Sequence, residues 1–174
     1  MTDPEFRAAF HEHKDAIYRF AWRMTNSAAA AEDVAQDVFL SLLRQPNGFD
    51  RSRGQLRSFL FGVARNLALK RWREENRWAP LEEERVIAEP VDAARGETAE
   101  IVGAAVRALP LLQREALVLA EYEGLSLDEI AHAVESEVGA VKARLHRARE
   151  NLRRMLAPLK ESDKRSPASH GTTE

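Results

Sequence analysis

The segment Leu125–Leu156, LSLDEIAHAVESEVGAVKARLHRARENLRRML, decides the fold of the C-terminal part of the chain. Its Ser126 is followed three residues later by Glu129, which is the pattern of a capping box at the start of a helix. A short helix is therefore predicted to begin here. Its apolar residues recur at helical spacing on one side, and they are Ile130, Ala131 and Val134.

A longer helix is predicted to begin after Glu137, because apolar residues again recur every three or four positions. These residues are Val138, Val141, Leu145, Ala148, Leu152 and Met155. The other faces of this helix carry many cations and few acids: Lys142, Arg144, Arg147, Arg149, Arg153 and Arg154 against Glu137 and Glu150. Together the two helices are typical of a helix-turn-helix, whose second helix enters the DNA major groove. The alternative is a packing helix with a solvated basic face.

The composition of the whole chain favours an all-α protein. The chain has 174 residues and a net charge of −2, and its helix formers outnumber β-branched residues. It has no cysteine, so disulfides and thiolate zinc sites are excluded. The histidines show no ligand spacing, and neither a Gly-rich phosphate loop nor a nucleophile–base pair is visible. We therefore expect no metal, no cofactor and no enzymatic activity.

The sequence contains no apolar run as long as a membrane span, and its start, MTDPEFRAAF, does not resemble a signal peptide. A cytoplasmic protein without direct membrane insertion is expected. The near-neutral net charge conceals basic segments that alternate with an acidic middle, so it does not argue against nucleic acid as a partner.

Two helices are predicted in the first 44 residues. The first begins with Asp3 as its cap and Pro4 in its first turn. The second runs from about Ala28 to Arg44, and the loop residues 45–48, QPNG, end it.

Residues 49–73 form a second basic segment. From Arg51 onward it contains no acidic residue, and an apolar stripe at helical spacing predicts another helix. Phe59, Phe61 and Trp72 lie among its cations. Such a surface suits single-stranded DNA, because cations follow the phosphates while rings stack on exposed bases. For each ring, packing in the core is the alternative.

Residues 78–96 interrupt the helical periodicity and are rich in acids, including Glu82, Glu83 and Glu84. We predict two small helical domains joined by a flexible acidic linker. The predicted boundaries are 1–78 for the N-terminal domain, 79–100 for the linker, 101–157 for the helix-turn-helix domain and 158–174 for a disordered tail.

Three motifs resemble those of one family, the extracytoplasmic-function (ECF) RNA polymerase sigma factors of the sigma-70 class. Residues 109–156, with LPLLQREALVLAEYEGLS followed by VGAVKARLHRARENLRRML, are similar to the family's region 4. AEDVAQDVFLSLL at 31–43 and RGQLRSFLFGVARNLALKRWRE at 53–74 are similar to parts of region 2. Ala140 and Ala143 replace common Thr and Ser hydroxyls of the family. Glu135 replaces a common turn Gly, which predicts a strained or reshaped turn.

The resemblance implies three sets of site residues. The set for binding core RNA polymerase is Glu32, Asp33, Gln36, Asp37, Phe39 and Leu40. The set for melting and recognising the promoter −10 element is Arg51, Ser52, Arg53, Gly54, Gln55, Arg57, Arg65, Asn66, Lys70 and Arg73. The set for recognising the −35 element as duplex is Glu137, Ala140, Lys142, Ala143, Arg144 and Arg147.

The function implied by the resemblance is promoter-specific initiation of transcription by core RNA polymerase. The implied partners are core polymerase, promoter DNA and an anti-sigma factor, which in this family is often membrane-bound. The main alternative is a stand-alone helix-turn-helix regulator, which would bind its site without polymerase. A second alternative is an adaptor whose charged helices contact only protein, and a helical enzyme is the weakest.

Overall fold

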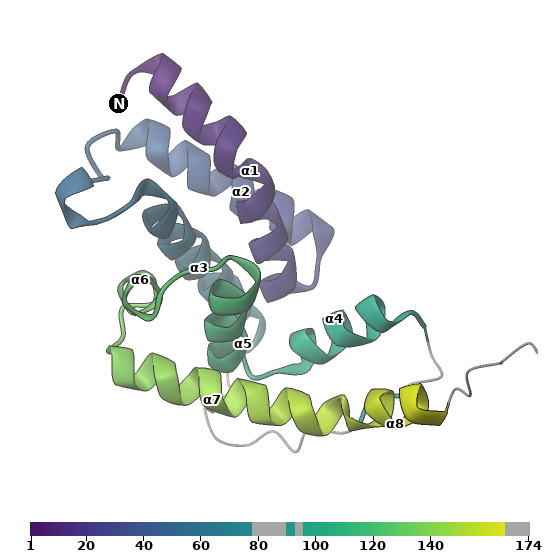
Figure 1. The fold of residues 1–174 in the computed structure, drawn as a ribbon. Helices are drawn as coiled ribbons and strands as arrows, with labels where there is room; N and C mark the ends of the chain where they lie inside the picture. Colours follow the sequence, from purple (N-terminus) through teal and green to yellow (C-terminus); the bar gives the residue numbers. More distant parts are fainter. Residues whose placement is uncertain (78–89, 93–95, 166–174) are drawn as a thin grey trace, which may run out of the picture.

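The computed structural model describes residues 1–77, 90–92 and 96–165, and over these ranges it contains helices and no β-strand. The prediction of an all-α protein is confirmed. The helices form two groups along the chain, one before and one after the predicted linker (Figure 1).

The first group contains α1 (Asp3–Thr25), α2 (Ala28–Arg44) and α3 (Leu56–Glu75), with a short 3-10 turn at Arg51–Arg53 before α3. Figure 1 shows α1 and α2 side by side, with α3 packed beneath them. The cap of α1 differs from the prediction, since Thr2 and not Asp3 is the N-cap. The Glu5 carboxylate accepts from the Thr2 N–H at 2.7 Å, so Thr2 and Glu5 complete a capping box that Asp3 cannot form.

The second group contains α4 (Thr98–Ala108), α5 (Leu111–Leu117), α6 (Leu127–Ala133), α7 (Val138–Met155) and α8 (Ala157–Arg165). A π-helical turn, η2 (Val118–Tyr122), extends α5. Ser126 accepts from the Glu129 N–H at 3.1 Å, so the predicted capping box at the start of α6 is present. The predicted short helix, turn and longer helix therefore correspond to α6 and α7.

The expectation of a disordered tail from residue 158 is wrong for its first part, because Ala157–Arg165 form α8. Pro158 can begin this helix because the first helical turn needs no intrahelical N–H donor. Leu156 accepts from the Leu159 N–H at 3.1 Å, which joins α8 to the end of α7. Residues 166–174 lie outside the described residues.

The predicted linker 79–100 falls mostly on residues outside the described ranges, namely 78–89 and 93–95. Its last three positions belong to α4. In the described piece 90–92, the Val91 N–H donates to the Met155 carbonyl at 3.0 Å, at the end of α7. Among the described residues, no helix is both long enough and apolar enough to cross a membrane.

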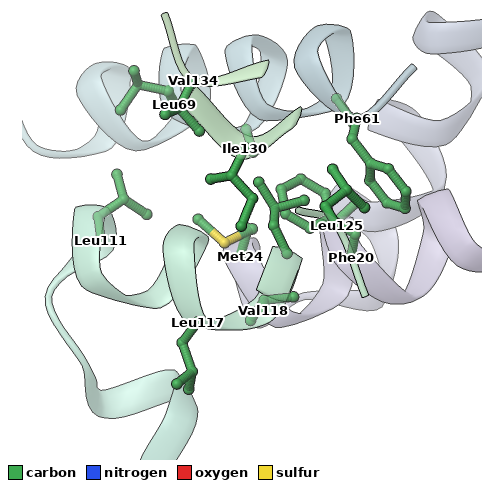
Figure 2. Packing of buried hydrophobic residues seen from close by; sticks show 14 of the residues in the cluster. Phe20, Met24, Phe61, Leu69, Leu111, Leu117, Val118, Leu125, Ile130 and Val134 are labelled. Atoms are coloured by element: carbon green, nitrogen blue, oxygen red, sulfur yellow. The ribbon is translucent and has the colours of Figure 1, made fainter. Parts of the chain in front are cut away.

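One apolar core joins the two groups of helices. Phe20 of α1 and Phe61 of α3 lie edge to face with ring centroids 5.5 Å apart. Figure 2 shows them in one cluster with residues of the second group, including Leu125 and Ile130. Ile130 is fully buried although it lies on the helix-turn-helix. The predicted domains therefore pack on each other through apolar side chains.

Candidate nucleic-acid interface

The loop before α3 holds two exposed cations of the predicted −10 set, Arg51 and Arg53. The Asp50 carboxylate accepts from both the N–H and the hydroxyl of Ser52, at 2.9 and 2.7 Å. These hydrogen bonds lower the pKa of Asp50. They also hold the 3-10 turn, in which Arg51 and Arg53 are exposed. Arg51 donates to Glu5 of α1 at 3.2 Å. The residues of the set that lie in this loop, Arg51, Ser52, Arg53, Gly54 and Gln55, are all exposed.

The rest of the −10 set lies along α3 and has unequal exposure. Asn66, Lys70 and Arg73 are exposed. Arg57 is half-buried, and its guanidinium lies 5.9 Å from the centre of the Phe61 ring. Arg65 is buried. Except for Arg65, the set lies at least partly on the surface.

The −35 set lies on α7 and the turn before it. Lys142 and Glu137 are exposed, and the others, Ala140, Ala143, Arg144 and Arg147, are half-buried. Arg144 donates to the Ser136 hydroxyl at 3.0 Å, which ties α7 to the turn. Glu135 in that turn has φ 52°. This left-handed conformation is the strain predicted for a residue that replaces Gly.

A groove of about 750 Å³ lies between the −10 loop and the helix-turn-helix. One wall contains Phe49 and Phe59, whose ring centroids are 5.5 Å apart, with Gln55 and Asn66 nearby. The other wall contains the turn and the first residues of α7, including Glu137. In this arrangement the two predicted DNA-recognition elements face each other across one groove.

A neighbouring groove of about 670 Å³ is strongly cationic. It runs between the C-terminal half of α3 and the turn of the helix-turn-helix. Its charged lining residues are Arg65, Lys70, Arg73, Arg77 and Arg144, with Glu74 and Glu135. Such a concentration of cations attracts the phosphates of nucleic acid.

The predicted polymerase-binding set lies on one face of α2, with one exception. Glu32, Asp33, Gln36, Asp37 and Leu40 are exposed. Phe39 is buried, because it packs edge to face against Phe10 with centroids 5.0 Å apart. Leu40 and Leu43 are 40% and 52% exposed, so the α2 face combines acids with apolar side chains. Asp33 also accepts from Arg71 of α3 at 2.9 Å.

Two charged residues of α5, the buried Glu115 and the half-buried Arg114, make contacts that the sequence did not reveal. Glu115 forms two hydrogen bonds with Arg65, and the Arg114 guanidinium donates to the Met24 and Leu109 carbonyls at 2.9 and 3.0 Å. Burial lowers the pKa of Arg114 to about 10. The signal in the sequence was the Arg-Glu pair within a largely apolar helix. The partners on α3 and at the end of α1 could not be inferred, because they lie far from this pair in the sequence.

The matches to family models establish the class. The model of sigma-70 region 2 matches residues 9–78, and the model of sigma-70 region 4 matches residues 99–152. Both models describe sigma factors, and sigma factors are initiation factors rather than enzymes. The chain belongs to the ECF RNA polymerase sigma factors of this class, as its relatives further indicate.

Among these relatives, the ECF RNA polymerase sigma factor SigW of Bacillus subtilis is 32% identical over 84% of this chain and 86% of its own length. The ECF RNA polymerase sigma factor SigE of Mycolicibacterium smegmatis is 31% identical over 88% of this chain, but the match spans only 62% of SigE.

Two solved structures have a similar fold. CnrH, in complex with the cytosolic domain of CnrY, is 26% identical with a TM-score of 0.66, over 93% of this chain and 91% of that one. The sigma factor RpoE of Bartonella quintana, in complex with the anti-sigma factor NepR, has a TM-score of 0.71 at 24% identity, over 88% of this chain and 97% of that one.

Proposed function

We propose that this chain binds core RNA polymerase and directs it to a specific class of promoters. Family membership over both regions carries this proposal, and the basic residues of the −10 loop, α3 and α7 support it. The exposed acidic and apolar face of α2 would contact the polymerase. We place this activity in the cytoplasm, where core polymerase and promoter DNA are found.

In the proposed mechanism, α7 recognises the −35 element as duplex, with its N-terminal half toward the base edges and its later cations toward phosphates. The loop at 47–55 and the face of α3 capture the melted −10 element. Unstacking a base costs a few kcal/mol, which a preformed pocket must offset. Phe49, Phe59 and Asn66 border the groove beside this loop and supply rings and an amide for such a pocket.

An anti-sigma factor is the third proposed partner. CnrH was solved with the cytosolic domain of CnrY. By analogy, we propose that a regulatory protein binds this chain and keeps it from core polymerase.

The test is reconstitution with sigma-free bacterial core polymerase, followed by transcription in vitro on fragmented genomic DNA of the source organism. New start sites that appear only with this protein are the expected result, and their upstream sequences would give both promoter elements. Core polymerase without the protein is the control. Failure to bind core, together with direct site-specific binding of duplex DNA, would favour a stand-alone regulator instead.

A further inference from the structure

We propose that Glu115 is an interdomain latch. Its carboxylate holds Arg65 away from DNA and keeps region 2 and region 4 closed on each other until polymerase and promoter separate them. This inference rests on the proposed function, since it takes Arg65 to be a −10 contact.

The latch is a two-point contact between α3 and α5. The Arg65 Nε lies 2.7 Å from Glu115 Oε2, and the Arg65 Nη2 lies 3.1 Å from Glu115 Oε1. The side chains are 10% and 2% exposed. Parallel hydrogen bonds of this kind use one whole edge of the guanidinium. Arg65 must therefore leave Glu115 before it can reach a phosphate or a base.

The surroundings make Glu115 dependent on a cation. Burial raises the pKa of Glu115, and the hydrogen bonds and charge of Arg65 only partly offset this, followed by the charge of Arg144. Removing one partner of a buried ion pair is unfavourable, because the other charge stays buried without compensation. The raised pKa of Glu115 is thus partly lowered by one arginine from each predicted DNA-recognition helix, Arg65 of α3 and Arg144 of α7. The Arg65 contact is made only while the two regions are together.

Further contacts close the same interface. The Ser58 hydroxyl of α3 donates to Glu129 of α6 at 2.9 Å. Gly62 of α3 faces α6, where an added Cβ would lie 3.4 Å from the Ala133 carbonyl oxygen, in van der Waals contact. The groove left between the −10 loop and the start of α7, about 750 Å³, has the size of a small-molecule pocket. While the two regions are closed, the −10 loop and the start of α7 border this one groove together.

The absence of native cysteine allows a direct measurement of closure. Glu12→Cys on α1 and Arg154→Cys on α7, both exposed positions, would carry spin labels in the full chain. We expect a single, shorter distance in this labelled parent and, with Glu115→Gln, a second population at a longer distance. The matched control is Glu121→Gln, which removes a carboxylate that accepts from Arg149 of the same region at 3.1 Å. This control should keep the short distance.

Opening should also release Arg65 for DNA. The labelled chains would be titrated with a fluorescent single-stranded oligonucleotide carrying the −10 sequence found by the transcription experiment. Glu115→Gln should bind it about tenfold more tightly, or more, because apparent affinity scales with the fraction of open protein. Equal or weaker binding than the parent, with Glu115→Gln still folded by circular dichroism, would overturn the proposal.

Gly62→Leu is the second opening variant, in case Glu115→Gln does not fold. It enlarges α3 against α6 without altering the ion pair or any residue of the three predicted sets. Gly62→Leu should lengthen the distance as well. A parent that is already open, or distances unchanged in every opening variant that folds, would reject the latch. Transcription in vitro with the parent protein distinguishes a failure of the latch from a failure of the proposed function. If the parent directs no transcription, the proposed function itself is refuted.

Discussion

Arg65 and Arg144 lie on the two predicted DNA-recognition helices, but their surroundings give them different properties. Arg65 is buried in a bidentate contact with Glu115. Arg144 is half-buried, and its hydrogen bond to the Ser136 hydroxyl lies within the helix-turn-helix. A substitution of Arg65 would therefore change domain closure and DNA contact together. Arg144 is the better residue for a test of promoter recognition.

Arg144→Ala is expected to weaken initiation at promoters that depend on the −35 element by about tenfold, since a good base contact contributes about 1–3 kcal/mol. Binding to core polymerase should not change. The measurement is transcription in vitro with reconstituted holoenzyme, beside gel-shift binding to core. Arg149→Ala is the control, because Arg149 lies on the same helix, outside the −35 set, and contacts Glu121. Unchanged promoter use with Arg144→Ala would remove Arg144 from the recognition set.

Ser58→Ala should lower the free energy of unfolding by about 1 kcal/mol at pH 7, because it removes a hydrogen bond to the Glu129 carboxylate. Burial alone would raise the pKa of Glu129, but the hydrogen bonds from Ser58 and Ser126 and the charge of Arg57 outweigh burial and lower it. A lowered pKa means that this stability is present above the ordinary value of 4.5 and is lost as pH falls through the folded value.

Urea unfolding from pH 7 down to pH 3 would check this prediction. The difference between wild type and Ser58→Ala should shrink at the acid end. Thr25→Ala is the control, since the Thr25 hydroxyl donates to the Ala21 carbonyl at 2.8 Å and has no titrating partner there. A Ser58→Ala effect that is as independent of pH as that of Thr25→Ala would contradict the role given to the carboxylate.

At the scale of elements, the turn between α6 and α7 depends on one unusual residue. Glu135 adopts φ 52°, in which a residue with a Cβ is about 1–2 kcal/mol less favourable. The position sets how α7 leaves α6, and therefore the direction in which the −35 set points. The turn keeps this shape although its sequence opposes it, because Ile130, Ala131 and Val141 on both sides are buried.

Glu135→Gly should accordingly stabilise the chain by about 0.5–1 kcal/mol relative to Glu135→Ala, after allowance for the larger freedom of Gly in the unfolded chain. The comparison with Ala isolates the backbone effect, because both variants lose the same carboxylate. The midpoints of thermal unfolding of Glu135→Gly and Glu135→Ala, measured under the same conditions, would show this difference in stability. If Gly and Ala give equal stability, the left-handed conformation costs nothing at this position.

The α2 helix presents a surface of a different kind from α3 and α7. Its exposed face combines Asp33, Gln36 and Asp37 with Leu40 and Leu43. We expect Asp33→Ala with Gln36→Ala to weaken binding to core polymerase at least tenfold. The fold should be little affected, because the exposed contact of Asp33 with Arg71 contributes little stability.

Co-purification with core polymerase and a fluorescence titration would measure this loss. Asp15→Ala is the control, as it removes an exposed acid from α1, which lies outside the predicted surface. Normal binding by the double variant would reject the assignment of this face to polymerase.

At the scale of the whole molecule, the positive and negative charges nearly cancel in number but lie on different parts of the surface. The net charge is −2, yet the groove between α3 and the helix-turn-helix is bordered by five cations, Arg65, Lys70, Arg73, Arg77 and Arg144. The attraction of this surface for DNA depends on local potential and not on the total, so the protein can bind a polyanion while carrying a slightly negative charge.

Lys70→Ala should lower the dependence of single-strand binding on salt. One lost phosphate contact reduces the slope of log K against log salt by about 0.7 for a single strand. Fluorescence anisotropy with the −10 oligonucleotide at several salt concentrations would give the slope. Lys160→Ala on α8, also exposed, should leave it unchanged. An unchanged slope for Lys70→Ala would place Lys70 outside the DNA contact.

Local patterns in the sequence were sufficient for α1 to α3, for α6 and α7, and for most of the exposed site residues. Apolar spacing predicted α6 and α7, because helix periodicity and capping act over a few residues. Acids and cations without local apolar partners stayed on the surface, as in the α2 face and the −10 loop. The same reasoning missed α8 and the Thr2 cap, where short-range contacts at a helix end decided the outcome.

Only the tertiary structure decided that Arg65 faces Glu115 and that the two regions close on one core. These residues are 50 positions apart, and no periodicity links them. Phe39 became buried for the same reason, since its neighbour Phe10 comes from another helix. Sequence spacing determines which side of its own helix a residue occupies. Whether that side meets solvent, DNA or another helix depends on how the helices pack, which is a property of the whole chain.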